Sequence, residues 1–139
     1  MEQRTIDYRP DQARILVVDD NVPLLRTTTR MLVDAGFHVL TAEDGPQALR
    51  VLESGERIDI LFTDLVLPGP LLGHQLATRA KAMRPGLKVL FTSGSASPTG
   101  DVQGLVNISE IDRLLSKPYL RRDLLARLQT LLAERPTRT

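Results

Sequence analysis

The chain has 139 residues, of which 42% are apolar, and this length and composition suit one domain with its own core. A net charge of +1 and an aromatic content of 4% argue against a nucleic-acid binder and against a base-stacking platform. The chain has no cysteine, which excludes disulfides and thiolate zinc sites, and no apolar run reaches the roughly 20 residues that span a bilayer.

The first half of the chain alternates β-rich runs with helical stretches. Residues 14–18 predict a strand, and residues 22–35 predict a helix that Asn21 caps and Gly36 ends. The elements expected next are a strand at 37–42, a turn at 44–46, a helix at 47–54 and a strand at 58–63. The third strand contains the apolar run Ile60-Leu61-Phe62, which is typical of a strand buried on both faces.

The second half continues the alternation. It predicts a helix at 72–83, a strand at 87–91, a loop at 93–104 with a short helix near 101–106, a strand at 112–116 and a helix at 120–133. Five strands alternating with helices predict a parallel sheet covered on both faces, that is, an α/β three-layer sandwich. The expected architecture is flavodoxin-like (βα)5 with strand order 2-1-3-4-5 and right-handed crossovers.

Polar, reactive residues follow four of these strands. They are Asp19 and Asp20 after the first strand, Asp64 after the third, Thr92 and Ser93 after the fourth, and Lys117 after the fifth. In the expected strand order, the switch point lies between the first and third strands at their carboxyl ends, where open α/β sheets bind ligands. The three aspartates fall at this point, so we expect a functional site there.

The residue types indicate the chemistry of that site. Three converging carboxylates repel one another unless a cation or a proton compensates them. A ligand set made only of oxygens favours Mg²⁺ or another hard cation over zinc. A carboxylate can attack phosphorus to form an acyl phosphate, while a metal and a lysine neutralise the transferred group.

The motifs at the strand ends resemble those of a known family. They are residues 17–21 (Val-Val-Asp-Asp-Asn), 63–69 (Thr-Asp-Leu-Val-Leu-Pro-Gly), 90–94 (Leu-Phe-Thr-Ser-Gly) and 115–119 (Leu-Ser-Lys-Pro-Tyr). In this order and spacing they resemble the receiver domain of two-component response regulators, over residues 13–133. The last two motifs most resemble receivers of hybrid sensor histidine kinases or their stand-alone relatives. The resemblance implies phosphorelay signalling in the cytoplasm.

The resemblance implies a metal site for Mg²⁺ or Mn²⁺. Asp20 would be a direct ligand and Asp19 would hold metal-bound water. Asp64 and the backbone carbonyl of Val66 would supply further contacts. Without metal, we expect the clustered acids to raise at least one carboxylate pKa by mutual repulsion.

The resemblance also implies how a phosphoryl group is handled. Asp64 would accept it from a phosphohistidine, Ser93 would be the hydroxyl that turns toward it, and Lys117 would pair with it. Thr92 is an alternative to Ser93, which is favoured because the small residue that the family places after the hydroxyl is Gly94 here. Such a chain is a switch and not an enzyme, apart from phosphorylating and dephosphorylating its own aspartate.

Three positions depart from the family pattern. Leu114 stands three residues before the lysine, where the family often has an aromatic side chain that reports phosphorylation. Gly73 comes one residue later than the usual glycine after the acceptor. Val66 is apolar where polar side chains can place an attacking water, so we expect slow hydrolysis of the phosphoryl group.

Other functions and the partners were weighed on the same residues. A degenerate receiver that only binds proteins would lack an acid or the lysine, and all are present. A dehalogenase-like phosphotransferase would have a second aspartate at the position of Val66, and in a flavin binder Asp19 and Asp20 would repel the phosphate. The expected partners are a sensor histidine kinase or a histidine phosphotransfer protein, without direct contact to nucleic acid or membrane, and both monomer and homodimer remain open. Residues 1–12 are expected to be a flexible tail or linker and residues 134–139 a disordered tail.

Overall fold

A five-stranded parallel sheet in the order β2-β1-β3-β4-β5 forms the centre of the molecule. The structure is a computed structural model that describes residues 13–94 and 114–134. The strands are β1 (Arg14–Val18), β2 (His38–Ala42), β3 (Ile60–Asp64), β4 (Lys88–Ser93) and β5 (Leu114–Ser116). The predicted fold class and strand order are confirmed.

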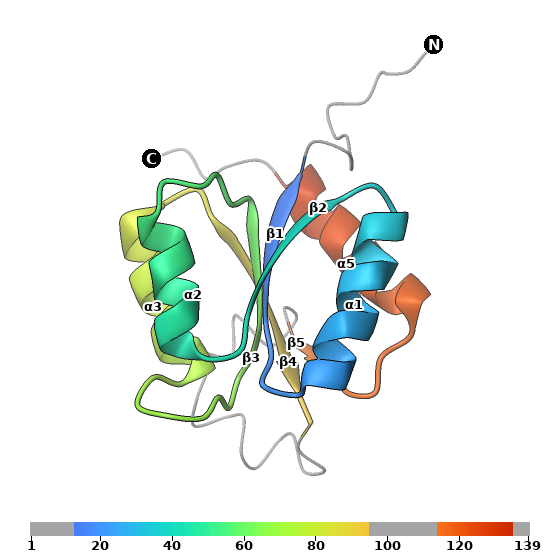
Figure 1. Cartoon of the computed structure of the whole chain (residues 1–139). Helices are drawn as coiled ribbons and strands as arrows, with labels where there is room; N and C mark the ends of the chain where they lie inside the picture. Colours follow the sequence, from blue (N-terminus) through green and yellow to red (C-terminus); the bar gives the residue numbers. More distant parts are fainter. Residues whose placement is uncertain (1–12, 95–113, 135–139) are drawn as a thin grey trace.

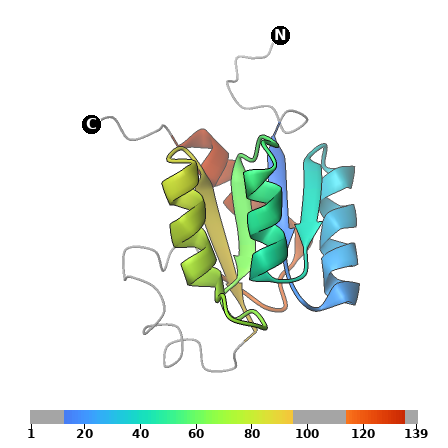
Figure 2. The same ribbon diagram turned by 60° about the vertical axis from the view of Figure 1, so that its left-hand side comes forward.

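Helices cover both faces of this sheet and make the three layers (Figures 1 and 2). The helices in the described ranges are α1 (Val22–Asp34), α2 (Gly45–Glu53), α3 (Gly73–Met83) and α5 (Arg121–Ala133). Helices α1 and α5 lie on one face, and α2 and α3 lie on the other (Figure 1). The short helix expected near 101–106 falls outside the described residues. None of the described helices combines the length and the apolar character that a bilayer crossing requires.

The core consists of two apolar clusters, one on each face of the sheet. Strand residues alternate between them, so Leu61 packs with α2 and α3, whereas Phe62 packs with α1 and α5. All five residues of β3 are buried, because β3 is a central strand with helices on both sides.

Two helix starts show how local sequence sets the fold. The Asn21 side chain accepts a hydrogen bond from the Leu24 amide at 3.1 Å and caps α1 as predicted. The predicted turn at 44–46 is wrong, because Gly45 begins α2. The Asp44 side chain caps this helix by accepting from the Gln47 amide at 2.8 Å, and proline is tolerated in a first turn.

The strand ends differ from the prediction in a way that matters for the site. Asp64, Thr92 and Ser93 were expected after their strands, but they are the last residues of β3 and β4. The ladder continues past them, since the Leu65 amide donates to the Thr92 carbonyl and the Lys117 amide donates to the Ser93 carbonyl, both at 2.9 Å. Strand β3 also begins two residues later than predicted, and residues 112–113 of the predicted fifth strand lie outside the described residues. The backbone that carries these polar side chains is therefore held in place by regular sheet hydrogen bonds.

Candidate functional site

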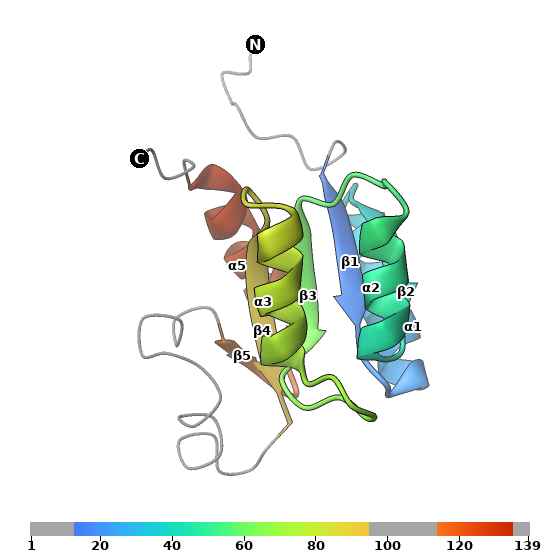
Figure 3. The same ribbon diagram turned by 90° about the vertical axis from the view of Figure 1, so that its left-hand side faces the viewer.

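The candidate site lies at the carboxyl end of the sheet, where the arrowheads of β1 and β3 point in Figure 3. Asp19 follows β1 directly, Asp64 ends β3, and Lys117 follows β5. Strands β1 and β3 are neighbours, although α1, β2 and α2 separate them in the sequence. The crossover thus brings together the aspartates of two motifs that are more than forty residues apart, as the strand order predicted.

Three carboxylates form an acidic cluster at this end. One oxygen from each of Asp19, Asp20 and Asp64 lies within 4.8 Å of the others. Asp19 is 3% exposed and Asp64 is 8% exposed, whereas Asp20 lies at the surface. Two buried oxygens and one accessible oxygen suit a hard cation that keeps part of its water shell, as Mg²⁺ does. The donor set therefore fits the metal that the sequence implied.

Lys117 lies between two of these acids. Its Nζ is 2.9 Å from Oδ2 of Asp19 and 2.8 Å from Oδ2 of Asp64. Its backbone is held by the hydrogen bond from its amide to the Ser93 carbonyl described above, and the peptide bond to Pro118 is cis. One ammonium thus faces two buried carboxylates, and with Asp20 nearby the ionised cluster keeps a net negative charge.

The pKa values of this group show that its charges are unbalanced. Burial raises the pKa of the Asp64 carboxyl above 3.8, and repulsion from Asp19 adds to this, although Lys117 pulls the pKa down. For Lys117, burial opposes the charged form, yet its bonds to Asp64 and Asp19 raise its pKa above 10.5. Both pKa values are therefore raised. Two carboxylates stabilise the charged form of Lys117, whereas the single charge of Lys117 does not offset the burial of Asp64 and its repulsion from Asp19. The pKa shift of Asp64 has the direction expected from the sequence, but its largest cause is burial and not repulsion.

Backbone contacts hold the two buried aspartates in place. The Asn21 amide donates to Oδ1 of Asp19 at 2.9 Å, and the Asp19 amide donates to the Ala42 carbonyl at 3.1 Å. Helix α3 begins directly against Asp64, so that a Cβ on Gly73 would lie 1.9 Å from the Asp64 carbonyl oxygen. Only glycine allows this approach. The sequence showed that Gly73 comes one residue later than the glycine of the family pattern. It did not show that Gly73 contacts the strand that carries Asp64.

The remaining candidate residues surround Asp64. Thr92 is the register partner of Asp64, is 2% exposed, and its hydroxyl has no hydrogen-bond partner within the described ranges. Ser93 is 5% exposed and ends the same strand. Val66 is 60% exposed, and its backbone amide lies close enough to the Asp64 carboxylate to lower the pKa of Asp64. All the candidates from the sequence therefore gather at one end of the sheet.

One residue of this region had no role in the sequence analysis. Tyr119 follows the Lys-Pro step, and its ring meets the ring of Phe62 edge-on with centroids 5.7 Å apart. Its hydroxyl lies 2.6 Å from Oγ1 of Thr28 in α1. The sequence shows that Tyr119 is two residues from Lys117, but the contact with Thr28 joins residues 91 positions apart and has no local signal.

Comparisons with known proteins agree with this geometry. A family model described as "Response regulator receiver domain" matches residues 15–129. The chain is 32% identical to the response regulator receiver protein CpdR of Brucella abortus over 123 residues, which is 86% of this chain and 96% of CpdR. It is 36% identical to the transcriptional regulatory protein PrrA of Mycobacterium tuberculosis over 122 residues, which is 88% of this chain but only 51% of PrrA.

A solved structure gives the same result at the level of the fold. The response regulator receiver protein from Sinorhizobium medicae WSM419 superposes with a TM-score of 0.73 at 31% identity. The match covers 86% of this chain and 94% of that chain. Its identity and its coverage agree with the sequence relatives, so fold and sequence point to the same family.

Proposed function

The chain belongs to the response regulator receiver domain family of two-component signalling, and from this premise we propose that Asp64 is its phosphoacceptor. The donor is a phosphohistidine of a sensor histidine kinase or of a histidine phosphotransfer protein. The observation that carries the proposal is the convergence of Asp19, Asp20, Asp64 and Lys117 at the carboxyl end of the sheet. A receiver that only binds proteins would not need a cluster of three acids and a lysine, two of whose acids are buried.

The acidic cluster is proposed to hold Mg²⁺, with Mn²⁺ as a substitute. Asp20 and Asp64 would be direct ligands, Asp19 would hold a metal-bound water, and the Val66 carbonyl would add an oxygen. The bound cation would supply positive charge to the transferred phosphoryl group. The all-oxygen donor set and its separation of at most 4.8 Å support this assignment.

The transfer joins Asp64 to a phosphoryl group that the partner's phosphohistidine supplies. A carboxylate oxygen of Asp64 forms a bond to phosphorus as the bond from phosphorus to the histidine nitrogen breaks, and the electron pair of that bond stays with the imidazole. Lys117 is already within 2.8 Å of Asp64 and can follow the new negative charge. Ser93, at the end of β4, is proposed as the hydroxyl that turns toward the phosphoryl group.

The proposed role is that of a switch. A phosphoryl group adds about −1.5 to −2 charges near pH 7, which biases an existing equilibrium toward the state that contacts it best. The chemistry of the chain is limited to accepting and losing this group, and the result is read by a protein partner. The family resemblance is our basis for a cytoplasmic location and for partners other than nucleic acid and membrane. The likeness to receivers of hybrid kinases stays a prediction, as does the division into residues 1–12, 13–133 and 134–139.

The decisive experiment measures the intact mass of the protein after incubation with a small acyl-phosphate donor and Mg²⁺. We expect the mass of one phosphoryl group to be added, the adduct to be labile to hydroxylamine, and Asp64→Ala to gain nothing. The matched control is Asp59→Ala, an aspartate at the amino end of the same region of sheet, which should gain the group like the parent. An adduct that persists in Asp64→Ala, or no adduct with either this donor or phosphohistidine proteins, would refute the proposal.

A further inference from the structure

Tyr119 connects three parts of the molecule with one side chain. It lies two residues after Lys117, its ring packs on Phe62, which lies two residues before Asp64, and its hydroxyl reaches Thr28 of α1. Thr28 is 1% exposed and Phe62 is 2% exposed, so the partly buried Tyr119 reaches two buried partners. Tyr119 therefore joins the segment that carries the lysine to the strand that carries the acceptor and to a helix.

The hydroxyl pair is a specific feature in this position. At 2.6 Å the contact between Tyr119 and Thr28 is a short O–H···O hydrogen bond, and either oxygen can be the donor. Burial raises the pKa of the Tyr119 phenol above 10.0, so this hydroxyl keeps its proton at neutral pH. Separating the pair would leave a buried hydroxyl on Thr28 without this partner, which is unfavourable. The bond thus fixes the distance between α1 and the chain after Lys117.

The lysine needs such support. Strand β5 has only three residues, and Lys117 follows it directly. Leu114, at the other end of β5, packs with the cluster of α2 and α3, on the opposite face from Tyr119. Leu115, which is buried in the α1 and α5 cluster, anchors the middle of β5 before the lysine, and Tyr119 holds the chain after the lysine to the same face of the sheet.

We infer that Tyr119 is a positioning residue for Lys117: its ring on Phe62 and its hydroxyl on Thr28 hold the lysine between Asp19 and Asp64 and couple its position to α1. The effect of Tyr119 on phosphoryl transfer rests on the proposed function, whereas its effect on the position of Lys117 does not. Because coupling is reciprocal, a shift of Lys117 toward a phosphoryl group also changes the contact at Thr28. Helix α1 thereby reports events at the site, although Leu114 replaces the aromatic residue that many receivers carry.

The test uses variants that remove one hydroxyl each and keep the packing. Tyr119→Phe keeps the ring on Phe62, and Thr28→Val keeps the β-branched shape. Thr29→Val is the matched control, since the Thr29 hydroxyl bonds to the Leu25 carbonyl within the same helix. The first readout is hydrogen exchange of the Lys117 amide, compared with amides of the central strand β3. The second is the rate at which the protein takes a phosphoryl group from the small donor.

We expect Tyr119→Phe and Thr28→Val each to speed exchange of the Lys117 amide about three- to tenfold, the size expected for one lost hydrogen bond, without an equal change in β3. Both should slow phosphoryl acceptance by a similar factor, and the double variant should be no slower than either single one, because the two hydroxyls act as one unit. Thr29→Val should behave like the parent.

Unchanged exchange at Lys117 in both variants would overturn the inference, as would equal acceleration in β3, which indicates general destabilisation. Full additivity of the two substitutions would also overturn it. If the parent accepts no phosphoryl group, the proposed function fails, but the exchange of the Lys117 amide still decides whether Tyr119 positions the lysine.

Discussion

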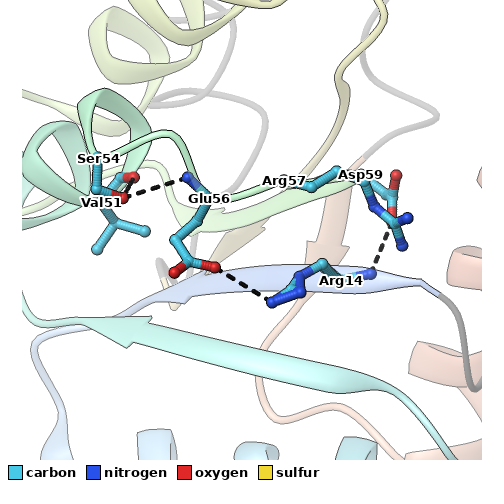
Figure 4. A network of polar contacts seen from close by, with 6 residues as sticks. All are labelled: Arg14, Val51, Ser54, Glu56, Arg57 and Asp59. Atoms are coloured by element: carbon cyan, nitrogen blue, oxygen red, sulfur yellow. Dashed lines mark hydrogen bonds and ion pairs between the residues drawn. The ribbon is translucent and has the colours of Figure 1, made fainter.

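The two ends of the sheet both carry charged side chains, yet they differ in hydration and in balance. At the amino end, Arg14 pairs with Glu56 at 3.2 Å and Arg57 pairs with Asp59 at 3.3 Å (Figure 4). These four side chains are 32–61% exposed. At the carboxyl end, the side chains of Lys117, Asp19 and Asp64 are 16%, 4% and 11% exposed. The two amino-end pairs thus match each cation with one anion, whereas among the described residues of the carboxyl-end cluster Lys117 faces three acids, Asp19, Asp64 and the exposed Asp20.

The difference shows how the same residue types serve two purposes. Hydrated, balanced pairs contribute little to stability, because water replaces each partner when the pair separates. The amino end is also tied by backbone bonds, such as the one from the Arg14 amide to Oδ2 of Asp59 at 2.8 Å. Charges held away from water lower stability unless something compensates them. The carboxyl end therefore retains a free-energy cost in the free protein, and a bound cation can relieve that cost.

The largest expected effect on stability comes from replacing a glycine with alanine, and the same replacement at the other end of the sheet is its control. Gly73→Ala would push a Cβ into the Asp64 carbonyl oxygen, which is backbone and cannot move aside. We expect the free energy of unfolding to fall by about 3 kcal/mol, the upper range of overpacking, and phosphoryl acceptance to fall with it. Denaturant unfolding measures the first and intact mass the second.

The matched control is Gly86→Ala, in the turn that leads into β4 at the amino end. A Cβ there would have no atom within 4 Å, so the stability should change little. Equal losses in the two variants would mean that the carboxyl end is no more tightly built than the amino end.

The second effect concerns metal binding. Mg²⁺ should stabilise the parent by about 1.4 kcal/mol at a concentration about ten times its Kd, because it binds the folded chain and compensates the clustered acids. Asp20→Ala should abolish this gain, since it removes the accessible ligand. Thermal unfolding with and without millimolar Mg²⁺ measures the shift, and Glu56→Ala, at the amino end, should respond like the parent. A parent that melts at the same temperature with and without the ion would contradict a metal site here.

The third effect is the pH dependence that the buried acceptor imposes. Well below pH 3.8, Asp64 is neutral in the folded and unfolded chains alike, so it adds no pH dependence. Above this value the unfolded carboxyl ionises, while burial holds the pKa of the folded carboxyl higher, so stability falls as pH rises through this window.

Asp64→Asn, measured with a chelator present, should therefore become progressively more stable than the parent as pH rises from about 3.8, until the folded carboxyl is ionised too. A gap between parent and Asp64→Asn that is constant with pH would show that the folded acceptor titrates like an unfolded one.

These contrasts also mark what the sequence could predict. The apolar runs that lead to Asp19, Asp64 and Lys117 predicted the strands, and their alternation with helices predicted the strand order. The positions of these residues predicted which end of the sheet gathers the acids, because the carboxyl ends of parallel strands lie at one edge of the sheet. The turn at 44–46 was misassigned because Asp44, Gly45 and Pro46 suit both a turn and a capped helix start. Contacts such as Gly73 on the Asp64 carbonyl and Tyr119 on Thr28 depend on how helices pack, and local patterns do not carry that information.

The smallest expected effect is the loss of stability when an exposed ion pair at the amino end of the sheet is removed. Glu56→Ala removes the partner of the Arg14 guanidinium, whose side chain is 33% exposed and can be hydrated in its place. We expect the free energy of unfolding to fall by only about 0.5 kcal/mol at low salt and by less at 1 M salt, where the pair is screened in the parent as well. Phosphoryl acceptance should not change, since the pair lies at the opposite end of β1 from Asp19. A salt-insensitive loss above about 2 kcal/mol would be outside the range of an exposed pair, and it would show that this end holds buried charge as well.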